Sequence, residues 1–128
     1  MTENQVPFLE FCGVRSEPAP DGHARLSVEV RPEIGNTRGH AHGGLMMTML
    51  DVALGRAARN SVPGAYSFVT IDLHTSFLKP GTGRLVAEGR RTGGGRSTVF
   101  CTGEIRDEAG DIVATANGVF KPILPRPA

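Results

Sequence analysis

The chain has 128 residues, of which 39% are hydrophobic and 21% charged, and this is typical of a single compact domain with one core. The 14 Lys and Arg residues balance 13 Asp and Glu residues to a net charge of +1, which argues against a nucleic-acid or membrane-surface partner. Cys12 and Cys101 are isolated, so the sequence indicates neither a metal cluster nor a disulfide framework and favours a reducing cytoplasm. Because we find no signal-peptide pattern and no apolar run of about 18 residues, we expect a cytoplasmic protein that does not span a membrane.

The N-terminal third predicts a short helix, a strand and a loop. Residues 6–12 predict a short helix or a packed lead-in to the domain. Apolar and polar residues alternate over residues 24–31, which is the pattern of a strand with one buried face, and Pro32 ends it. Residues 33–42, with two glycines and Asn36, predict an irregular loop that leads to a helix.

Residues 43–60 predict one long buried helix. The segment is apolar on nearly every side through Leu54, which is typical of a buried helix. Arg56 and Arg59 lie near its C-terminal end, where cations suit the helix dipole. Pro63 and Gly64 end the helix.

The second half of the chain predicts four strands separated by turn sequences, at residues 66–78, 84–92, 97–106 and 112–121. Short connections predict that these four pair as an antiparallel meander, with the earlier strand joining at an edge or in the centre. A long helix on such a sheet is an α+β fold. Since a single five-stranded sheet cannot cover both sides of an apolar helix, we expect at least a homodimer.

The most informative motif is His42-Gly43-Gly44 followed by Asp51 on the predicted helix. Free N–H groups at a helix start are donors for a carbonyl oxygen or an anion, and a carboxylate in an apolar stretch is costly unless it is paired or used. Gly43 and Asp51 are eight residues apart, or about 12 Å along a helix, so one helix cannot present both groups to one carbonyl. If both act on one substrate, the site combines Gly43 of one subunit with Asp51 of another.

The order of elements and the pattern Asn36-x5-His42-Gly43-Gly44-x6-Asp51 resemble the hotdog-fold acyl-coenzyme A thioesterases of the phenylacetate-degradation (PaaI-like) type, related to the 4-hydroxybenzoyl-CoA thioesterases. The resemblance extends to residues 69–73, 77–81, 90–96 and 110–114. It implies one hotdog domain over residues 1–128, in which an antiparallel sheet of five to six strands wraps around one long buried helix.

The resemblance also implies roles for five residues. Asp51 would be the nucleophile or the general base that activates a water, and the Gly43 N–H would donate to the thioester oxygen. Asn36 would help to hold the water or the carboxylate, His42 would orient the helix start, and Thr70 would place a hydroxyl near the attacking water. Position 55 carries a glycine where the 4-hydroxybenzoyl branch has a threonine, so that branch's details do not transfer.

Two further groups are candidates for substrate binding. Residues at the helix start would line the acyl pocket: Gly44, Leu45, Met46 and Met49. Residues 84–106 hold five arginines against two glutamates, and three of these arginines flank a glycine-rich turn and would bind coenzyme A phosphates: Arg90, Arg91 and Arg96. A solvated hairpin explains these arginines equally well. We expect no metal and no cofactor, although His40-Ala41-His42 and Asp72-Leu73-His74 have the spacing of metal ligands.

The expected activity is hydrolysis of a small aryl, arylacetyl or short to medium acyl-CoA, or of an acyl carrier protein thioester, to a carboxylic acid and a free thiol. The expected assembly is a homodimer with shared sites that pairs into a tetramer. One alternative is an acyl-CoA hydratase, which usually has Asp-x4-His where this chain has Arg56. Another is a non-catalytic module that senses acyl-CoA. In the simplest alternative, Asp51 pairs with Arg56 or Arg59, and His42 and Gly43 only begin a helix.

Overall fold

The computed structural model describes residues 6–127. Residues 1–5 and residue 128 lie outside this range. The expectation that the N-terminus is not a signal peptide, and the two ends of the predicted domain, therefore fall partly on residues that the structure does not describe. In chain order the described elements are α1 (Pro7–Cys12), β1 (Arg15–Glu17), β2 (His23–Glu29), the 3-10 helix η1 (Pro32–Ile34), α2 (Gly43–Asn60), β3 (Ser67–Phe77), β4 (Arg84–Gly94), β5 (Val99–Arg106) and β6 (Ile112–Ile123). The short N-terminal helix and the long helix over residues 43–60 are confirmed.

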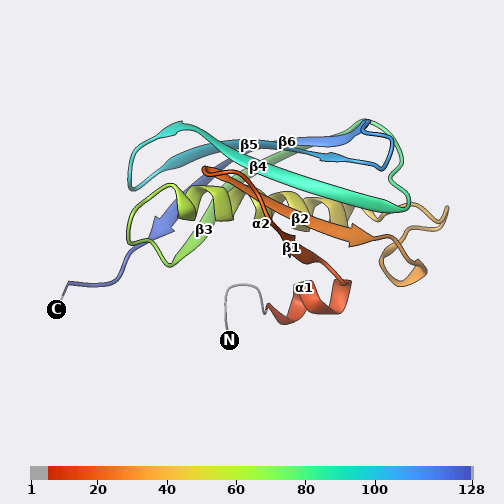
Figure 1. Ribbon diagram of the computed structural model, residues 1–128, viewed down its shortest axis with the longest axis horizontal. Helices are drawn as coiled ribbons and strands as arrows, with labels where there is room; N and C mark the ends of the chain where they lie inside the picture. The colour runs from red at the N-terminus through yellow and green to blue at the C-terminus, as the bar shows by residue number, and fades with distance from the viewer. Residues whose placement is uncertain (1–5, 128) are drawn as a thin grey trace.

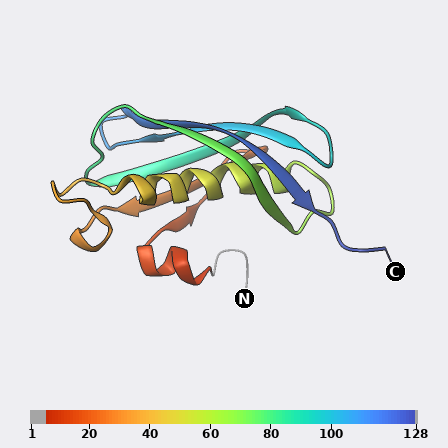
Figure 2. The same cartoon turned by 180° about the vertical axis from the view of Figure 1, so that it is seen from behind.

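The six described strands form one antiparallel sheet in the order β1-β2-β4-β5-β6-β3 (Figure 1). The predicted meander is confirmed for β4, β5 and β6 and is wrong for β3, which pairs with β6 and not with β4; Figure 2 shows β3 and β6 side by side. β4 has β2 on one side and β5 on the other, so neither edge of β4 is open to β3, which pairs at the outer edge of β6. The turn sequence at residues 78–83 therefore crosses between distant strands and does not close a hairpin. β1, with three residues, is too short for its pattern to have been recognised.

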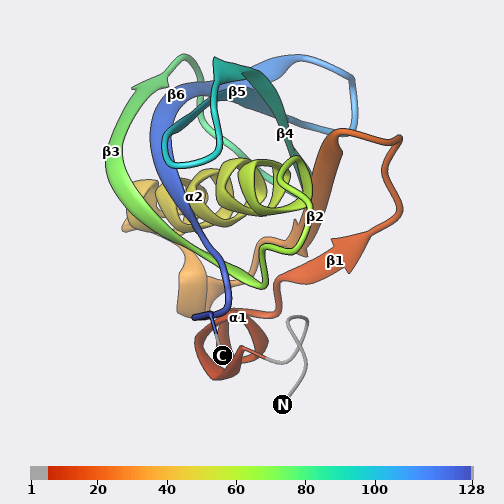
Figure 3. The ribbon, with the colours of Figure 1, turned by 90° about the vertical axis from the view of Figure 1, so that its left-hand side faces the viewer.

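The sheet curves around α2, as the end-on view in Figure 3 shows. Met49, Leu50 and Leu54 on α2 are fully buried, and each such side chain contributes about 1.5–3 kcal/mol to folding relative to an exposed position. Gly89 on β4 allows the helix to approach closely, because a Cβ there would lie 2.6 Å from the carbonyl group of Ala53. The hotdog arrangement of a sheet wrapped around one helix is confirmed.

A single chain covers more of α2 than the apolar pattern predicts. Residues 53–59 are all buried within the described chain, whereas the outer face from Gly43 to Val52 is partly open to solvent. The part of the helix that stays partly exposed is thus its N-terminal half. Neither helix in the described part of the chain combines the length and apolar character needed to cross a membrane.

Candidate active site

The start of α2 presents one backbone donor to solvent. His42 is the N-cap residue, with an extended backbone, and its Nδ1 accepts a hydrogen bond of 2.9 Å from the Gly44 N–H. The preceding N–H, that of Gly43, has no acceptor among the described residues. The His42 side chain therefore accepts from the N–H of Gly44 and leaves the N–H of Gly43 available to a ligand.

Asn36 shapes the loop before the helix. Its Oδ1 accepts hydrogen bonds from the backbone N–H groups of Arg38, at 2.9 Å, and His40, at 3.1 Å. Its own N–H donates to the His40 carbonyl oxygen at 2.7 Å. The side chain thus holds a turn in place and is not in contact with Asp51.

A first cavity, of about 380 Å³, lies at this helix start. Its walls come from the loop before α2, the first turn of α2 and the end of β3: Asn36, Arg38, His40, Ala41, Gly43, Met46, Phe77, Leu78, Lys79 and Pro80. Of the predicted acyl-pocket residues only Met46 lines it, since Leu45 and Met49 are buried in the hydrophobic core and Gly44 is exposed. Arg38 and Lys79, which no sequence pattern indicated, also line it.

Lys79 is held at the rim of the first cavity by two carboxylates. Its Nζ lies 3.0 Å from Asp107 and 3.0 Å from Asp111. The hydrogen bonds to Asp107 and Asp111 raise the pKa of Lys79 above its ordinary value, so the ammonium stays charged. Sequence patterns missed this group because the two aspartates follow the lysine by more than 25 residues.

Asp51 lies two turns further along α2, and β3 supplies its partner. Thr70 Oγ1 donates a hydrogen bond of 2.5 Å to Asp51 Oδ1. The pairing of β3 with β6 shifts by one residue between Thr70 and Asp72, as in a β-bulge, and such irregularities redirect neighbouring side chains. The Thr70 hydroxyl thus lies beside the Asp51 carboxylate, and its predicted role near an attacking water stays a prediction. Among the described residues Asp51 has no ion-pair partner, so the alternative pairing with Arg56 or Arg59 is not formed.

A second cavity, of about 430 Å³, contains Asp51. The outer face of α2 forms one side, and α1 and the start of β3 form the others. Its lining residues are Val6, Phe8, Leu9, Thr48, Asp51, Val52, Arg56, Arg59, Tyr66, Ser67 and Phe68. Gly43 and Asp51 are therefore in different cavities of one chain, as the helix rise requires.

The three predicted phosphate-binding arginines do not lie together. Arg90 pairs with Glu104 at 2.8 Å, and Arg91 donates to Ser61 Oγ at 2.9 Å and to two carbonyl oxygens of its own turn. Both guanidinium groups are thus engaged in holding the β4–β5 hairpin. Arg96 lies apart from them, in another cavity.

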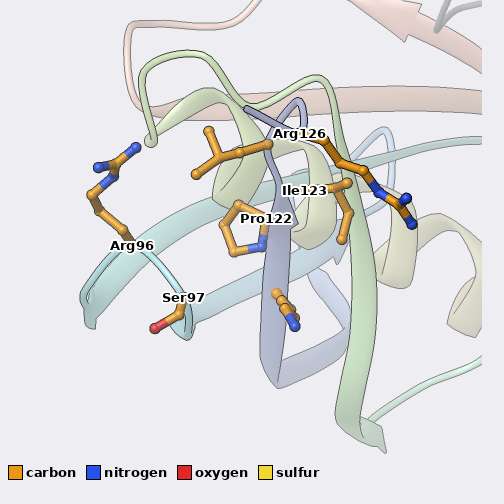
Figure 4. Close-up of a pocket in the computed structure, with 7 residues that line it drawn as sticks. Arg96, Ser97, Pro122, Ile123 and Arg126 are labelled. Atoms are coloured by element: carbon orange, nitrogen blue, oxygen red, sulfur yellow. The ribbon is translucent and has the colours of Figure 1, made fainter. Parts of the chain in front are cut away.

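This third cavity, of about 600 Å³, joins the β4–β5 turn to the chain around the end of β6 (Figure 4). It is lined by Arg96, Ser97, Lys121, Pro122, Ile123, Leu124 and Arg126. Arg96 and Arg126 lie on either side of Pro122 and Ile123 in the figure. The lining holds three cations and no carboxylate, so it favours an anion that has an apolar part. Lys121 and Arg126 were missed because they follow Arg96 by 25 and 30 residues, and only the pairing of the strands places them beside it.

Neither cysteine has the properties of a nucleophile. Cys12 and Cys101 are both buried free thiols. Burial raises the pKa of Cys101 to about 11, so it is a neutral thiol at pH 7. Among residues 6–127 no three His, Cys, Asp or Glu side chains are grouped as metal ligands would be.

Comparison with known proteins identifies the family of this chain. The sequence model of the thioesterase superfamily matches residues 38–114. A protein of Halobacterium salinarum, provisionally named an esterase, is 33% identical over 125 residues, which cover 89% of this chain and 83% of that protein.

Solved structures show the same fold at low sequence identity. An esterase-like protein of Mycobacterium tuberculosis has a TM-score of 0.86 at 22% identity, covering 95% of this chain and 100% of that one. The PaaI protein of Escherichia coli, from the phenylacetic acid degradation operon, has a TM-score of 0.83 at 22% identity, covering 93% and 86%. A thioesterase of Haemophilus influenzae has a TM-score of 0.86 at 16% identity, covering 94% and 85%. With a family match over more than half of its length, the chain belongs to the thioesterase superfamily and is a thioester hydrolase.

Proposed function

We propose that the protein hydrolyses acyl-CoA thioesters at sites that two copies of the chain share, with Gly43 from one copy and Asp51 from the other. The observation that carries this proposal is the separation of the two groups. They lie in different cavities, about 12 Å apart along one rigid helix, so one chain cannot present both the Gly43 N–H and the Asp51 carboxylate to the same carbonyl.

The proposed reaction uses the two halves in one step. Asp51, oriented by Thr70, removes a proton from a water whose oxygen attacks the thioester carbonyl carbon. The carbonyl oxygen becomes an oxyanion that accepts a hydrogen bond from the Gly43 N–H of the other copy. When the intermediate collapses, the C–S bond breaks and coenzyme A leaves as a thiolate, which needs no strong acid; the thiolate takes up the proton held by Asp51, and the carboxylate is restored. In the alternative, Asp51 attacks the carbonyl carbon itself and water then hydrolyses the resulting anhydride.

The edge of the sheet favours the pairing of two copies. β3 is the outermost strand on its side of the sheet and exposes three large apolar side chains: Val69 at 52%, Ile71 at 58% and Phe77 at 49%. Exposed apolar edge strands are sites for pairing with a second chain. Since β3 flanks both cavities, a two-fold axis beside it would bring Gly43 of one copy toward Asp51 of the other. Further pairing of dimers into a tetramer stays a prediction from the family resemblance.

We assign the nucleotide end of coenzyme A to the cavity of Arg96, Lys121 and Arg126. These three cations suit phosphate oxygens, and Pro122 and Ile123 give an apolar surface for a base. Arg90 and Arg91 then hold the hairpin and do not bind phosphate. The acyl group, a small aryl, arylacetyl or short to medium chain, occupies the cavity beside Asp51.

Mixing two inactive variants tests the shared site. Asp51→Asn removes the carboxylate and Gly43→Pro removes the N–H, so each homodimer lacks one half of both sites. In a heterodimer of the two variants, one site has both changes and the other has neither. After random exchange half of the dimers are mixed, so about a quarter of the wild-type rate of CoA release should return. No recovery in confirmed mixed dimers, or full activity of a stable monomer, would contradict the proposal.

A further inference from the structure

Phe68 on β3 lies directly on the backbone of α2 at Gly55. A Cβ added to Gly55 would be 2.0 Å from Phe68 Cε2, 2.3 Å from Cζ and 2.4 Å from Cδ2. Real Cβ atoms never approach a ring so closely, so any side chain at position 55 would displace the ring. The glycine and the phenylalanine therefore act as a pair, in which the missing side chain makes room for the ring.

The Phe68 ring also contacts a second aromatic ring. It contacts Phe120 edge to face, with ring centroids 5.9 Å apart and planes at 76°. Phe120 is fully buried, and it packs against a second glycine, because a Cβ at Gly118 would lie 2.6 Å from its Cε2. Two rings that pack on two glycines form a rigid unit, because they cannot change shape as a flexible methionine side chain can.

This unit lies one helical turn beyond the proposed catalytic carboxylate. Gly55 follows Asp51 by four residues, or about 6 Å along α2. Phe68 lines the same cavity as Asp51 and Val52. An acyl group that extends from a carbonyl at Asp51 along the helix toward its C-terminus therefore meets the ring within about one turn.

We propose that Phe68, seated on Gly55, is the residue that limits the size of the acyl group. This inference rests on the proposed function and adds a specificity-determining residue to it. It restricts the substrates to short or compact acyl groups, because a longer chain would have to displace a ring packed against the helix backbone and Phe120.

The test is the rate of CoA release across a straight-chain series from acetyl-CoA to decanoyl-CoA. Phe68→Ala vacates the space over Gly55 and should raise the ratio of kcat/KM for decanoyl-CoA to that for butanoyl-CoA by about tenfold or more. Phe68→Leu, the variant less disturbing to folding, should shift the ratio in the same direction by a smaller factor. Gly55→Ala should shift it in the opposite direction, because the new methyl group drives the ring into the cavity.

Phe100 provides the matched control, because it is a phenylalanine on β5 that is 46% exposed and does not line the cavity. Phe100→Ala should leave the ratio unchanged. An unchanged ratio in both folded Phe68 variants, or an equal shift in Phe100→Ala, overturns the inference while the proposed function stands. Absence of CoA release by the wild type on every member, and also on benzoyl-CoA and phenylacetyl-CoA, would instead contradict the proposed function.

Discussion

The two cavities on the outer face of α2 differ in what each contributes. The cavity at the helix start offers a backbone N–H and cationic side chains, which suit a developing oxyanion and the negative charge of a substrate. The cavity in the middle of the helix offers a carboxylate with a hydroxyl partner and mostly apolar walls, which suit an attacking group and an acyl chain. In the proposed mechanism, one helix thus carries the two halves of an acyl-transfer site at a spacing that prevents a single chain from using both.

The two halves also differ in how they are held. The Gly43 N–H is fixed by the helix itself and by the His42 cap, so it depends little on any other element. Asp51 depends on Thr70, which β3 delivers from the edge of the sheet beside an irregularity in the strand pairing. A change in β3 should therefore disturb the attacking group more than the oxyanion donor.

The largest effect is expected from Asp51→Asn. Asparagine keeps the size of the side chain and an oxygen that accepts from Thr70, but it neither takes a proton nor attacks a carbonyl. We expect kcat for acyl-CoA to fall by about 10²- to 10⁴-fold with little change in KM. Steady-state release of free thiol measures this, and undiminished turnover would remove Asp51 from the mechanism.

Gly43→Pro should have the next largest effect. Gly43 is the first residue of α2, where proline is accommodated, and His42 already has the extended backbone that precedes proline. The change therefore removes one N–H with little cost to folding, and we expect kcat to fall by about 10²- to 10³-fold.

Gly43→Ala is the matched control, because it keeps the N–H. Its methyl group would lie 3.5 Å from Phe77 Cζ, an ordinary contact. If Gly43→Ala keeps near wild-type turnover, and both variants keep the wild-type melting temperature, the loss of kcat in Gly43→Pro is due to the missing N–H donor. If both variants lose activity equally, the N–H is not the oxyanion donor.

Local patterns predicted most of the helices and strands of this fold. The capped helix over residues 43–60 and the strands after it follow from apolar periodicity and from turn residues, which are properties of neighbouring positions. The pairing of β3 with β6 did not follow, because it depends on which strand edges are free once β2 has paired with β4. Local sequence patterns do not predict which of the free strand edges a given strand will pair with.

The same distinction applies to the site. The separation of Gly43 from Asp51 is a consequence of helix geometry and was predictable. The position of Phe68 over Gly55 was not, although the glycine was noticed, since the ring comes from another element 13 residues later. Arg90 and Arg91 were grouped with Arg96 because they flank one turn, whereas side-chain direction separates them.

Thr70→Val tests how Asp51 is held. Valine keeps the shape of threonine but removes the hydroxyl, so the carboxylate loses its 2.5 Å hydrogen bond. We expect kcat to fall by about tenfold, the loss of one hydrogen bond to a charged group, while KM changes little. Thr70→Ser restores the hydroxyl and should recover most of the rate. Equal losses in the valine and serine variants would mean that Thr70 acts only through packing.

The smallest effect is expected in the third cavity, where charges lie near solvent. Lys121→Ala or Arg126→Ala should raise KM for an acyl-CoA by about threefold to tenfold without changing kcat, because each removes one contact to phosphate. Arg90→Gln should leave KM unchanged, since Arg90 is engaged by Glu104. The discriminating substrate is an acyl-pantetheine, which has the thioester but no phosphates. If the Lys121 and Arg126 variants raise KM as much for this substrate as for acyl-CoA, the third cavity does not bind the nucleotide, and Arg38 at the first cavity becomes the better candidate.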